Sequence, residues 1–303
     1  MTHPRHRDPL PLGGDDALPY SKGLMARALT AAGVSFDRAY ELARGVEIEL
    51  TRSGDKPIDL DRLRTLAMGV LGVEAGTDAV DRLRRYRQLQ ELDIPILLLV
   101  GGGTGTGKST VATEAAYRLG ITRVTSTDFI RQTMRAFFSA EFMPSIHYSS
   151  FEAGRHLESN EGERDVLGGF LDQARNVLVG VRASIERALE EGFSMVLEGV
   201  HLVPGFVPPS IDGALVVQCV LAIDSREEHA AHFWSRDAAS DGVRPLEKYL
   251  DAFPDIRLIQ EHIVERARRL DVPVIENTSF DRAIGEVMEL VLARAEQFAT
   301  VAS

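Results

Sequence analysis

The stretch LLLVGGGTGTGKST, residues Leu97–Thr110, decides the fold of this chain. It predicts a buried strand, then a glycine-rich loop, then the first turn of a helix. The fixed positions of the phosphate-loop pattern G-x-x-x-x-G-K-[ST] are filled by Gly102, Gly107, Lys108 and Ser109. Glycines let the backbone turn its N–H groups toward phosphate oxygens, and the N-terminus of the following helix favours negative charge. The stretch therefore predicts a site for a nucleoside triphosphate.

The residues of this loop have separate predicted roles. Lys108 would reach the β- and γ-phosphates, and the hydroxyl of Ser109 would bind Mg²⁺. The alternative is a glycine-rich turn that binds nothing, but the strand before it and the helix after it favour the phosphate site. ATP and Mg²⁺ are therefore the predicted cofactors, and the residues expected to hold the nucleotide are Gly102, Gly103, Thr104, Gly105, Thr106, Gly107, Lys108, Ser109 and Thr110.

The amino-acid composition limits which kinds of protein this chain can be. The chain has 303 residues, of which 44% are hydrophobic, so a sizeable core is expected. The longest apolar run, Ile94–Val100, is the length of a strand, not of a membrane span. Residues 1–17 contain no apolar signal segment and predict a disordered tail. The single cysteine, Cys219, lies in an apolar run and predicts a buried thiol. These features predict a cytoplasmic protein with no membrane partner.

The distribution of charge narrows the choice of partner. The net charge is −11, and residues 1–92 hold equal numbers of acidic and basic side chains, so the excess lies in residues 93–303. A domain this acidic binds nucleic acid poorly. A small acceptor, held by a few local cations, is expected instead, and a homo-oligomer is left open.

Residues 18–92 predict a small helical module. The apolar spacing and the capping residues predict helices at 21–32, 36–50 and 59–71, and a last one capped by Thr77 or Asp78 that runs to residue 92. Lys22 and Arg27 stand close to the first helix start and could bind an anion. A packing extension without a ligand is the alternative. The segment resembles the ATP-cone module that precedes some kinases and ribonucleotide reductases.

From residue 96 onward, strands alternate with helices. This pattern predicts an α/β domain at 93–303, a three-layer P-loop kinase-type fold with a parallel sheet. The expected strands are 96–100, 123–126, 193–197, 215–223 and 272–275. Ligands of such sheets gather at the carboxyl ends of the strands, where the chain carries Asp128, Glu198, His201, Asp224 and Asn277.

Asp128 is the predicted catalytic carboxylate. It follows the strand after the phosphate loop, where it could orient an acceptor hydroxyl or take its proton. The alternative is an ordinary helix N-cap. Arg131 lies one helical turn further on and could bind an anionic group of the acceptor.

Glu198 ends the run MVLE in a Walker-B-like position. It could act in catalysis and, with Ser109, hold the metal or contact the acceptor. A strand-end acid that caps a turn is the alternative. His201 follows closely and is a weaker candidate for the acceptor site.

Cationic side chains further along the chain complete the prediction. Arg236 precedes the polar turn 237–245 and Arg244 lies near its end, as the arginines of a mobile kinase lid do, and both could neutralise the transferring phosphoryl group. Arg155 directly follows the irregular segment 140–154, which is placed to cover the acceptor. Surface arginines and a plain loop are the alternatives.

Four runs of sequence carry a family resemblance: residues 19–34 (PYSKGLMARALTAAGV), 102–135 (GGTGTGKSTVATEAAYRLGITRVTSTDFIRQTMR), 196–205 (VLEGVHLVPG) and 273–277 (PVIEN). Together they resemble the 2-phosphoglycerate kinase family. The resemblance implies ATP-dependent phosphorylation of 2-phosphoglycerate to 2,3-bisphosphoglycerate. Two alternatives stay open: a kinase of another small acceptor, such as a sugar, polyol or nucleotide sugar, and a non-catalytic ATP sensor.

Overall fold

The computed structural model describes residues 20–53, 60–92, 94–157, 165–239 and 246–302. Contacts divide the chain into two units, residues 1–93 with 295–303, and residues 94–294. The predicted tail at 1–17 lies outside the described residues, and the predicted domain boundaries stay a prediction. Within the described residues, no helix is long and apolar enough to cross a membrane.

The first unit is helical. Its helices are α1 (Lys22–Ala31), α2 (Phe36–Ser53), α3 (Leu60–Leu71) and α4 (Val73–Glu91). The hydroxyl of Ser21 caps α1 by accepting a 3.4 Å hydrogen bond from the amide of Leu24. The end of α11 belongs to this unit, where Glu296 forms a 2.7 Å ion pair with Arg85.

The predicted start of α4 at Thr77 or Asp78 is wrong. Gly72, with φ 89°, makes the turn out of α3, and α4 begins directly after it. Thr77 lies inside the helix, where its hydroxyl donates a 2.8 Å bond to the carbonyl of Val73. Glycine adopts a positive φ without strain, so α3 and α4 meet at Gly72. The last helix therefore begins earlier than the sequence pattern indicated.

The second unit is built on a five-stranded parallel sheet with the order β2-β3-β1-β4-β5, which confirms the predicted α/β fold. The strands are β1 (Ile96–Gly102), β2 (Val124–Ser126), β3 (Met195–Glu198), β4 (Leu215–Ala222) and β5 (Val274–Glu276). The phosphate loop follows the central strand β1. Val100 stands beside Glu198 of β3, so that carboxylate lies at the same edge of the sheet as the loop.

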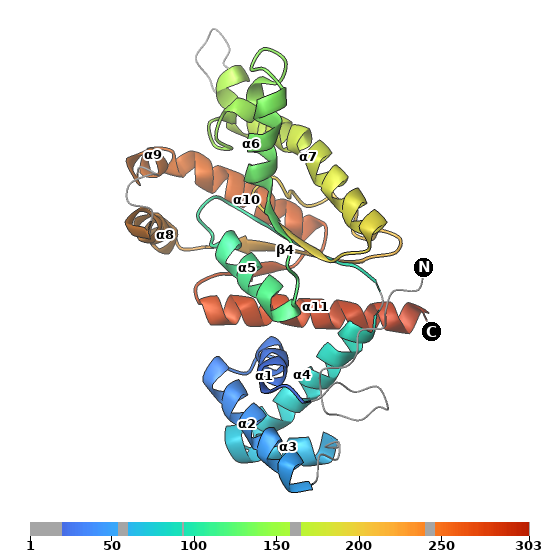
Figure 1. Cartoon of the computed structure of the whole chain (residues 1–303). Helices are drawn as coiled ribbons and strands as arrows, with labels where there is room; N and C mark the ends of the chain where they lie inside the picture. Colours follow the sequence, from blue (N-terminus) through green and yellow to red (C-terminus); the bar gives the residue numbers. More distant parts are fainter. Residues whose placement is uncertain (1–19, 54–59, 93, 158–164, 240–245, 303) are drawn as a thin grey trace. The chain divides into compact units, whose positions relative to one another are not determined.

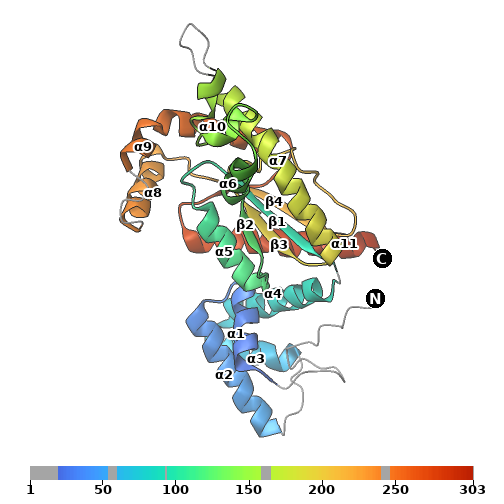
Figure 2. The same ribbon diagram turned by 45° about the horizontal axis from the view of Figure 1, so that its top comes forward.

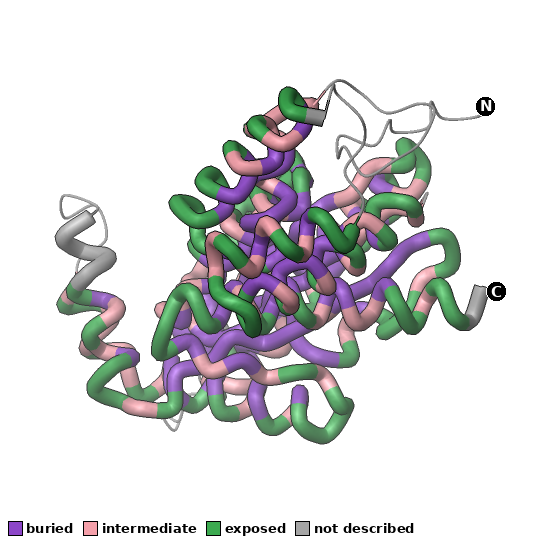
Figure 3. Tube along the Cα trace, turned by 90° about the horizontal axis from the view of Figure 1, so that it is seen from below, coloured by how far each residue is buried: buried purple, intermediate pink, exposed green. Residues whose placement is uncertain are grey.

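Helices cover both faces of this sheet, with α5 and α11 on one side and α7 and α10 on the other (Figures 1 and 2). Alternate residues of β1 face opposite sides: Leu97 and Leu99 join one core cluster with Val177 and Val181 of α7. Figure 3 shows helices that alternate between buried and exposed residues, as amphipathic helices over a core do. The remaining elements are α5 (Lys108–Leu119), α6 (Thr127–Phe137), η1 (Pro144–His147), η2 (Ala153–Leu157), α7 (Val166–Glu191), α8 (Arg226–Ala239), α9 (Leu246–Asp251), α10 (Phe253–Arg269) and α11 (Phe280–Ala302).

Two parts of this unit differ from the expected pattern. The segment expected to be irregular contains the short 3₁₀ helices η1 and η2. The next helix, α7, begins at Val166 because Asp165 caps it, accepting a 2.7 Å bond from the amide of Gly168. The turn expected at 237–245 is helical as far as Ala239, and its remainder lies outside the described residues.

Candidate active site

The backbone of the phosphate loop requires glycine. Gly102 has φ 136°, and a Cβ there would lie 2.2 Å from the carbonyl oxygen of Leu221 in β4. Gly105 has φ 88°, and its Cβ would lie 2.5 Å from the ring of Phe233. The loop therefore adopts its path only with these residues, close against its neighbours.

Lys108 is buried and turned back over the loop, where its ammonium donates a hydrogen bond to the carbonyl of Gly103. Burial lowers the pKa of Lys108, while the negative charges of Glu198 and Asp128 oppose that shift. A desolvated ammonium gains more from an anionic ligand than an exposed one does. This placement suits contact with the terminal phosphates of a nucleotide.

Ser109 and Glu198 meet directly. The Ser109 hydroxyl donates a 2.9 Å bond to Oε1 of Glu198, which is itself buried at the end of β3. Burial raises the pKa of Glu198, although the charge of Lys108 and the bond from Ser109 lower it. A hydroxyl and a carboxylate beside a phosphate site are the oxygen donors that Mg²⁺ uses, so these residues fit the ion.

Asp128 is not needed as a helix cap. Ser126 caps α6 instead, with its hydroxyl accepting a 3.0 Å bond from the amide of Phe129. The Asp128 side chain is 67% exposed and forms a 3.2 Å ion pair with Arg131. Partial burial raises the pKa of Asp128, but His201, Arg131 and Lys108 outweigh it and hold that pKa below its usual value. The carboxylate is therefore an ionised acceptor of hydrogen bonds.

Arg131 connects Asp128 to the segment around η1. Its Nε donates to Asp128, and its Nη1 donates 2.9 Å bonds to the carbonyls of Ile146 and Tyr148. These bonds fix the guanidinium and leave Nη2 out of them. The Arg131 side chain is only 9% exposed, so its bonds mainly position Asp128 and the segment.

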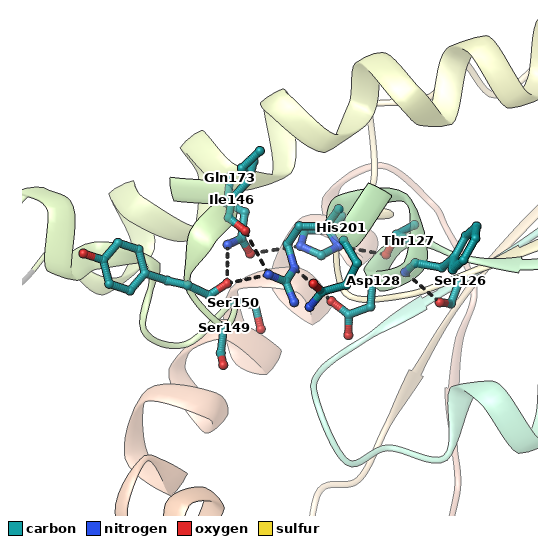
Figure 4. A network of polar contacts seen from close by, with 12 residues as sticks. Ser126, Thr127, Asp128, Ile146, Ser149, Ser150, Gln173 and His201 are labelled. Carbon is teal, nitrogen blue, oxygen red and sulfur yellow. Dashed lines mark hydrogen bonds and ion pairs between the residues drawn. The ribbon is translucent and has the colours of Figure 1, made fainter. Parts of the chain in front are cut away.

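Behind Asp128 lies a buried network whose hydrogen positions can be assigned (Figure 4). Nε2 of Gln173 donates to the carbonyls of Ser145, at 2.6 Å, and Tyr148, at 3.1 Å. Its Oε1 therefore accepts from Nε2 of His201 at 3.0 Å. Nδ1 of His201 must then accept from the hydroxyl of Thr127, at 2.8 Å. His201 is held as one neutral tautomer.

His201 is fully buried, and burial lowers its pKa to about 4. It therefore lies behind the surface on which an acceptor would bind, and its position suits support of Asp128 better than the direct acceptor contact expected for it. Gln173 completes this support. No motif marks it, because a glutamine inside a long helix has no recognisable spacing.

A second group of polar side chains borders the phosphate loop. The hydroxyls of Thr104 and Ser150 lie 3.5 Å apart. Lys248 of α9 donates a 3.3 Å bond to the neighbouring Ser149 and forms a 2.7 Å ion pair with Glu152. Partial burial raises the pKa of Glu152, but the bonds from Lys248 and Ser149 outweigh it and lower that pKa.

The predicted cations have different outcomes. Arg155 lies in η2, half exposed, with a 3.2 Å ion pair to Glu152, which places it near Lys248. Arg236 lies on α8 but its side chain is outside the described part, and Arg244 lies outside the described residues. The structure adds Lys248 to this set, a residue that no motif marked in the sequence.

The loop is also held from α8, by residues that the sequence did not single out. His229 and His232 bond to the carbonyls of Thr104 and Gly105. Asn277, which the strand-end rule did identify, donates a 2.9 Å bond to the carbonyl of Thr106. The three-residue spacing of the histidines places them on one face of a helix, which is a signal that sequence reading could use.

No model of a protein family matches this chain. It is 37% identical over 281 residues to 2-phosphoglycerate kinase of Pyrococcus furiosus, a match that covers 93% of this chain and 92% of that protein. It is 35% identical to 2-phosphoglycerate kinase of Methanopyrus kandleri, covering 91% and 85% of the two chains. It is also 37% identical to 2-phosphoglycerate kinase of Methanothermobacter thermautotrophicus, a match that covers 89% of both chains. These relatives show that the chain belongs to the 2-phosphoglycerate kinase family.

Proposed function

We propose that this protein transfers the γ-phosphoryl group of ATP to the 3-hydroxyl of 2-phosphoglycerate, which gives ADP and 2,3-bisphosphoglycerate. The observation that carries the proposal is the grouping at the carboxyl edge of the sheet. There the Ser109–Glu198 contact stands beside the buried Lys108, whose pKa responds to the charges of both Glu198 and Asp128. The names of the relatives supply the acceptor.

The donor is held by the phosphate loop. Its N–H groups and the N-terminus of α5 bind the phosphate oxygens, and Lys108 neutralises charge at the β- and γ-phosphates. Ser109 and Glu198 would hold Mg²⁺, which when bound neutralises phosphate charge. Since Lys108 lies over Gly103, the terminal phosphate would lie on the Gly103–Thr104 side of the loop.

Asp128 acts on the acceptor. Its ionised carboxylate accepts the hydrogen bond of the 3-hydroxyl and takes the proton as the oxygen–phosphorus bond forms and the bond to ADP breaks. Arg131 holds the carboxylate in place from 3.2 Å. The neutral His201 keeps α6 and the η1 segment together without adding a competing charge.

The acceptor carries a carboxylate and a phosphate, so its site needs cations. Lys248 and Arg155 lie beside Ser149 and Glu152, and Nη1 of Arg131 bonds to the carbonyl of Tyr148, the residue before Ser149. We assign the binding of the acceptor anions to these three residues. Arg236 and Arg244 complete the proposal as lid residues that neutralise the transferring group.

The test is ADP release measured over a panel of acceptors. The panel contains 2-phosphoglycerate, 3-phosphoglycerate, glycerate, a sugar and a polyol, and the product is identified by phosphorus NMR. Turnover stimulated by 2-phosphoglycerate above the others, and reduced about a hundred-fold or more by Lys108→Ala, supports the proposal. ATP binding without stimulation by any acceptor would contradict it and favour an ATP sensor.

The helical unit is proposed as a separate module with its own nucleotide site. Lys22, near the start of α1, lies 3.2 Å from Glu47 and 5.4 Å from the ring of Tyr40, so a phosphate would have to displace the Glu47 carboxylate. Calorimetry of the full chain carrying Lys108→Ala tests this. ATP binding that survives in the variant and falls with Lys22→Ala supports a second site, and its absence removes the proposal.

A further inference from the structure

Consecutive carbonyl groups of the phosphate loop all accept hydrogen bonds from side chains. The carbonyl of Gly103 accepts from Lys108 and, at 3.0 Å, from the hydroxyl of Thr106. The next carbonyls accept from side chains outside the loop, at 2.8 Å for Thr104, 3.1 Å for Gly105 and 2.9 Å for Thr106, and the partners are His229, His232 and Asn277.

These bonds also fix the amide groups. In a planar trans peptide the C=O and the following N–H point in opposite directions. A carbonyl of Thr104 that is held toward α8 therefore turns the N–H of Gly105 away from α8, and the carbonyl of Gly105 does the same for the N–H of Thr106. A glycine-rich backbone resists the rotation of a peptide group only weakly, so an outside partner is needed to keep the amides in one orientation.

His229 is built for this role. It is fully buried, and its ring stacks on Phe233, with centroids 5.5 Å apart, and meets Phe253 edge-on at 5.4 Å. Because a carbonyl only accepts, Nε2 must carry the proton, and Nδ1 is then a bare acceptor that has no partner among the described residues. Burial lowers the pKa of His229 to about 4, against the bond to Thr104, so the ring remains neutral and donates from one fixed atom.

His232 uses the opposite nitrogen. It lies three residues further on α8 and donates from Nδ1 to the carbonyl of Gly105. The two rings therefore hold neighbouring peptide groups through different atoms. This difference matters for the test, because the amide nitrogen of glutamine reaches the position of Nε2 and that of asparagine reaches the position of Nδ1.

We propose that His229 and His232 are positioning residues for the ATP phosphates, which hold the carbonyls of Thr104 and Gly105 outward so that the amides of Gly105 and Thr106 face the donor. The inference rests on the proposed function only in taking ATP as the donor. Without the histidines, a peptide that turns over would present a carbonyl oxygen to a phosphate, which repels it.

The experiment replaces each histidine in turn by glutamine and by asparagine. His229→Gln and His232→Asn keep a donor at the right place, whereas His229→Asn and His232→Gln move it by about one bond length. The dissociation constant for ATP is measured by calorimetry on the full chain, together with kcat, the KM for each substrate and the melting temperature. We expect the misplaced donors to weaken ATP binding about tenfold and the matched ones to stay within about threefold of the parent.

His147→Ala is the control. His147 also bonds to a backbone carbonyl, that of Phe138 at 2.9 Å, but not in the phosphate loop, so its loss should leave the ATP dissociation constant unchanged. Equal ATP affinity in folded matched and misplaced variants would overturn the inference, and so would equal loss in both. If the parent protein binds ATP but phosphorylates no acceptor, the proposed function fails while this comparison remains valid.

Discussion

The hydroxyl of Ser109 donates a 2.9 Å hydrogen bond to Glu198, which ties the first turn of α5 to the carboxyl end of β3. If these oxygens hold Mg²⁺, removing the charge of Glu198 should weaken the binding of Mg²⁺ more than the binding of ATP. We therefore expect Glu198→Gln to raise the Mg²⁺ concentration needed for half-maximal activity and to lower kcat about a hundred-fold. Steady-state rates over a series of Mg²⁺ concentrations measure both effects.

Glu286→Gln, on the exposed face of α11, is a matched control because its partner Arg282 is 54% exposed at 3.6 Å. The control should behave as the parent. An unchanged Mg²⁺ requirement in Glu198→Gln would show that Glu198 does not act through the ion.

Asp128 is the next carboxylate to test. Asp128→Asn keeps the shape and the contact with Arg131 but cannot take a proton. We expect kcat to fall by about 10² to 10⁴, with the KM for ATP within about threefold of the parent. The exposed Asp212→Asn is the control. A variant with full kcat would remove Asp128 from the chemistry and leave it only a contact of Arg131.

Lys248 tests the acceptor site. Its side chain is 45% exposed, and its ammonium contacts both Ser149 and Glu152, so a substrate anion can reach it. Lys248→Met should raise the KM for 2-phosphoglycerate about tenfold while the KM for ATP stays constant, and Lys248→Arg should keep most of the affinity. A parallel rise of both KM values would indicate damage to the fold around α9 instead.

The parts of the fold that could be predicted from the sequence depend on local signals. The start of α5 is predicted correctly, because the phosphate loop leads directly into its first turn at Lys108. The strand-end rule placed Glu198 and Asn277 at the loop. In each case the signal lies within a few residues of the feature that it predicts.

The remaining features depend on partners far apart in the chain. The acceptor-side contact of Lys248 with Ser149 joins residues 99 positions apart, and the bond of His229 to Thr104 joins residues 125 positions apart. The spacing of residue types along the sequence does not indicate such pairs, because each contact depends on how α8 and α9 pack against the loop. His201 was identified as a candidate but its burial was not, since a strand-end residue can face either the solvent or the core.

The buried histidines predict a loss of stability in acid. His201 and His229 have pKa values of about 4 in the folded protein, against 6.5 in the unfolded chain. As the pH falls below 6.5, the unfolded chain binds protons that the folded protein does not, so stability falls until about pH 4, below which their contribution is constant. Each histidine should lower the free energy of unfolding by about 2 kcal/mol between pH 7 and pH 5.

Urea denaturation of the parent and of His229→Gln at these two pH values measures this cost. Glutamine does not titrate, so the variant should lose about 2 kcal/mol less than the parent over the same interval. The same pH dependence in both proteins would mean that His229 titrates in the folded state as it does in the unfolded chain.

Gly199 is the position where the active site depends most strictly on the backbone. It follows Glu198 with φ 148°, and a Cβ there would lie 1.8 Å from the hydroxyl oxygen of Thr127, which bonds to His201. Gly199→Ala must therefore strain the backbone or displace Thr127 and release His201. We expect a loss of roughly 3 kcal/mol in the free energy of unfolding and a lower kcat. Gly285→Ala is the control, because nothing lies within 4 Å of its Cβ position in α11, and alanine there should stabilise the helix by about 0.5 to 1 kcal/mol. Urea denaturation of both variants decides the matter: if Gly199→Ala is as stable as the parent, the close contact with Thr127 does not constrain this part of the site.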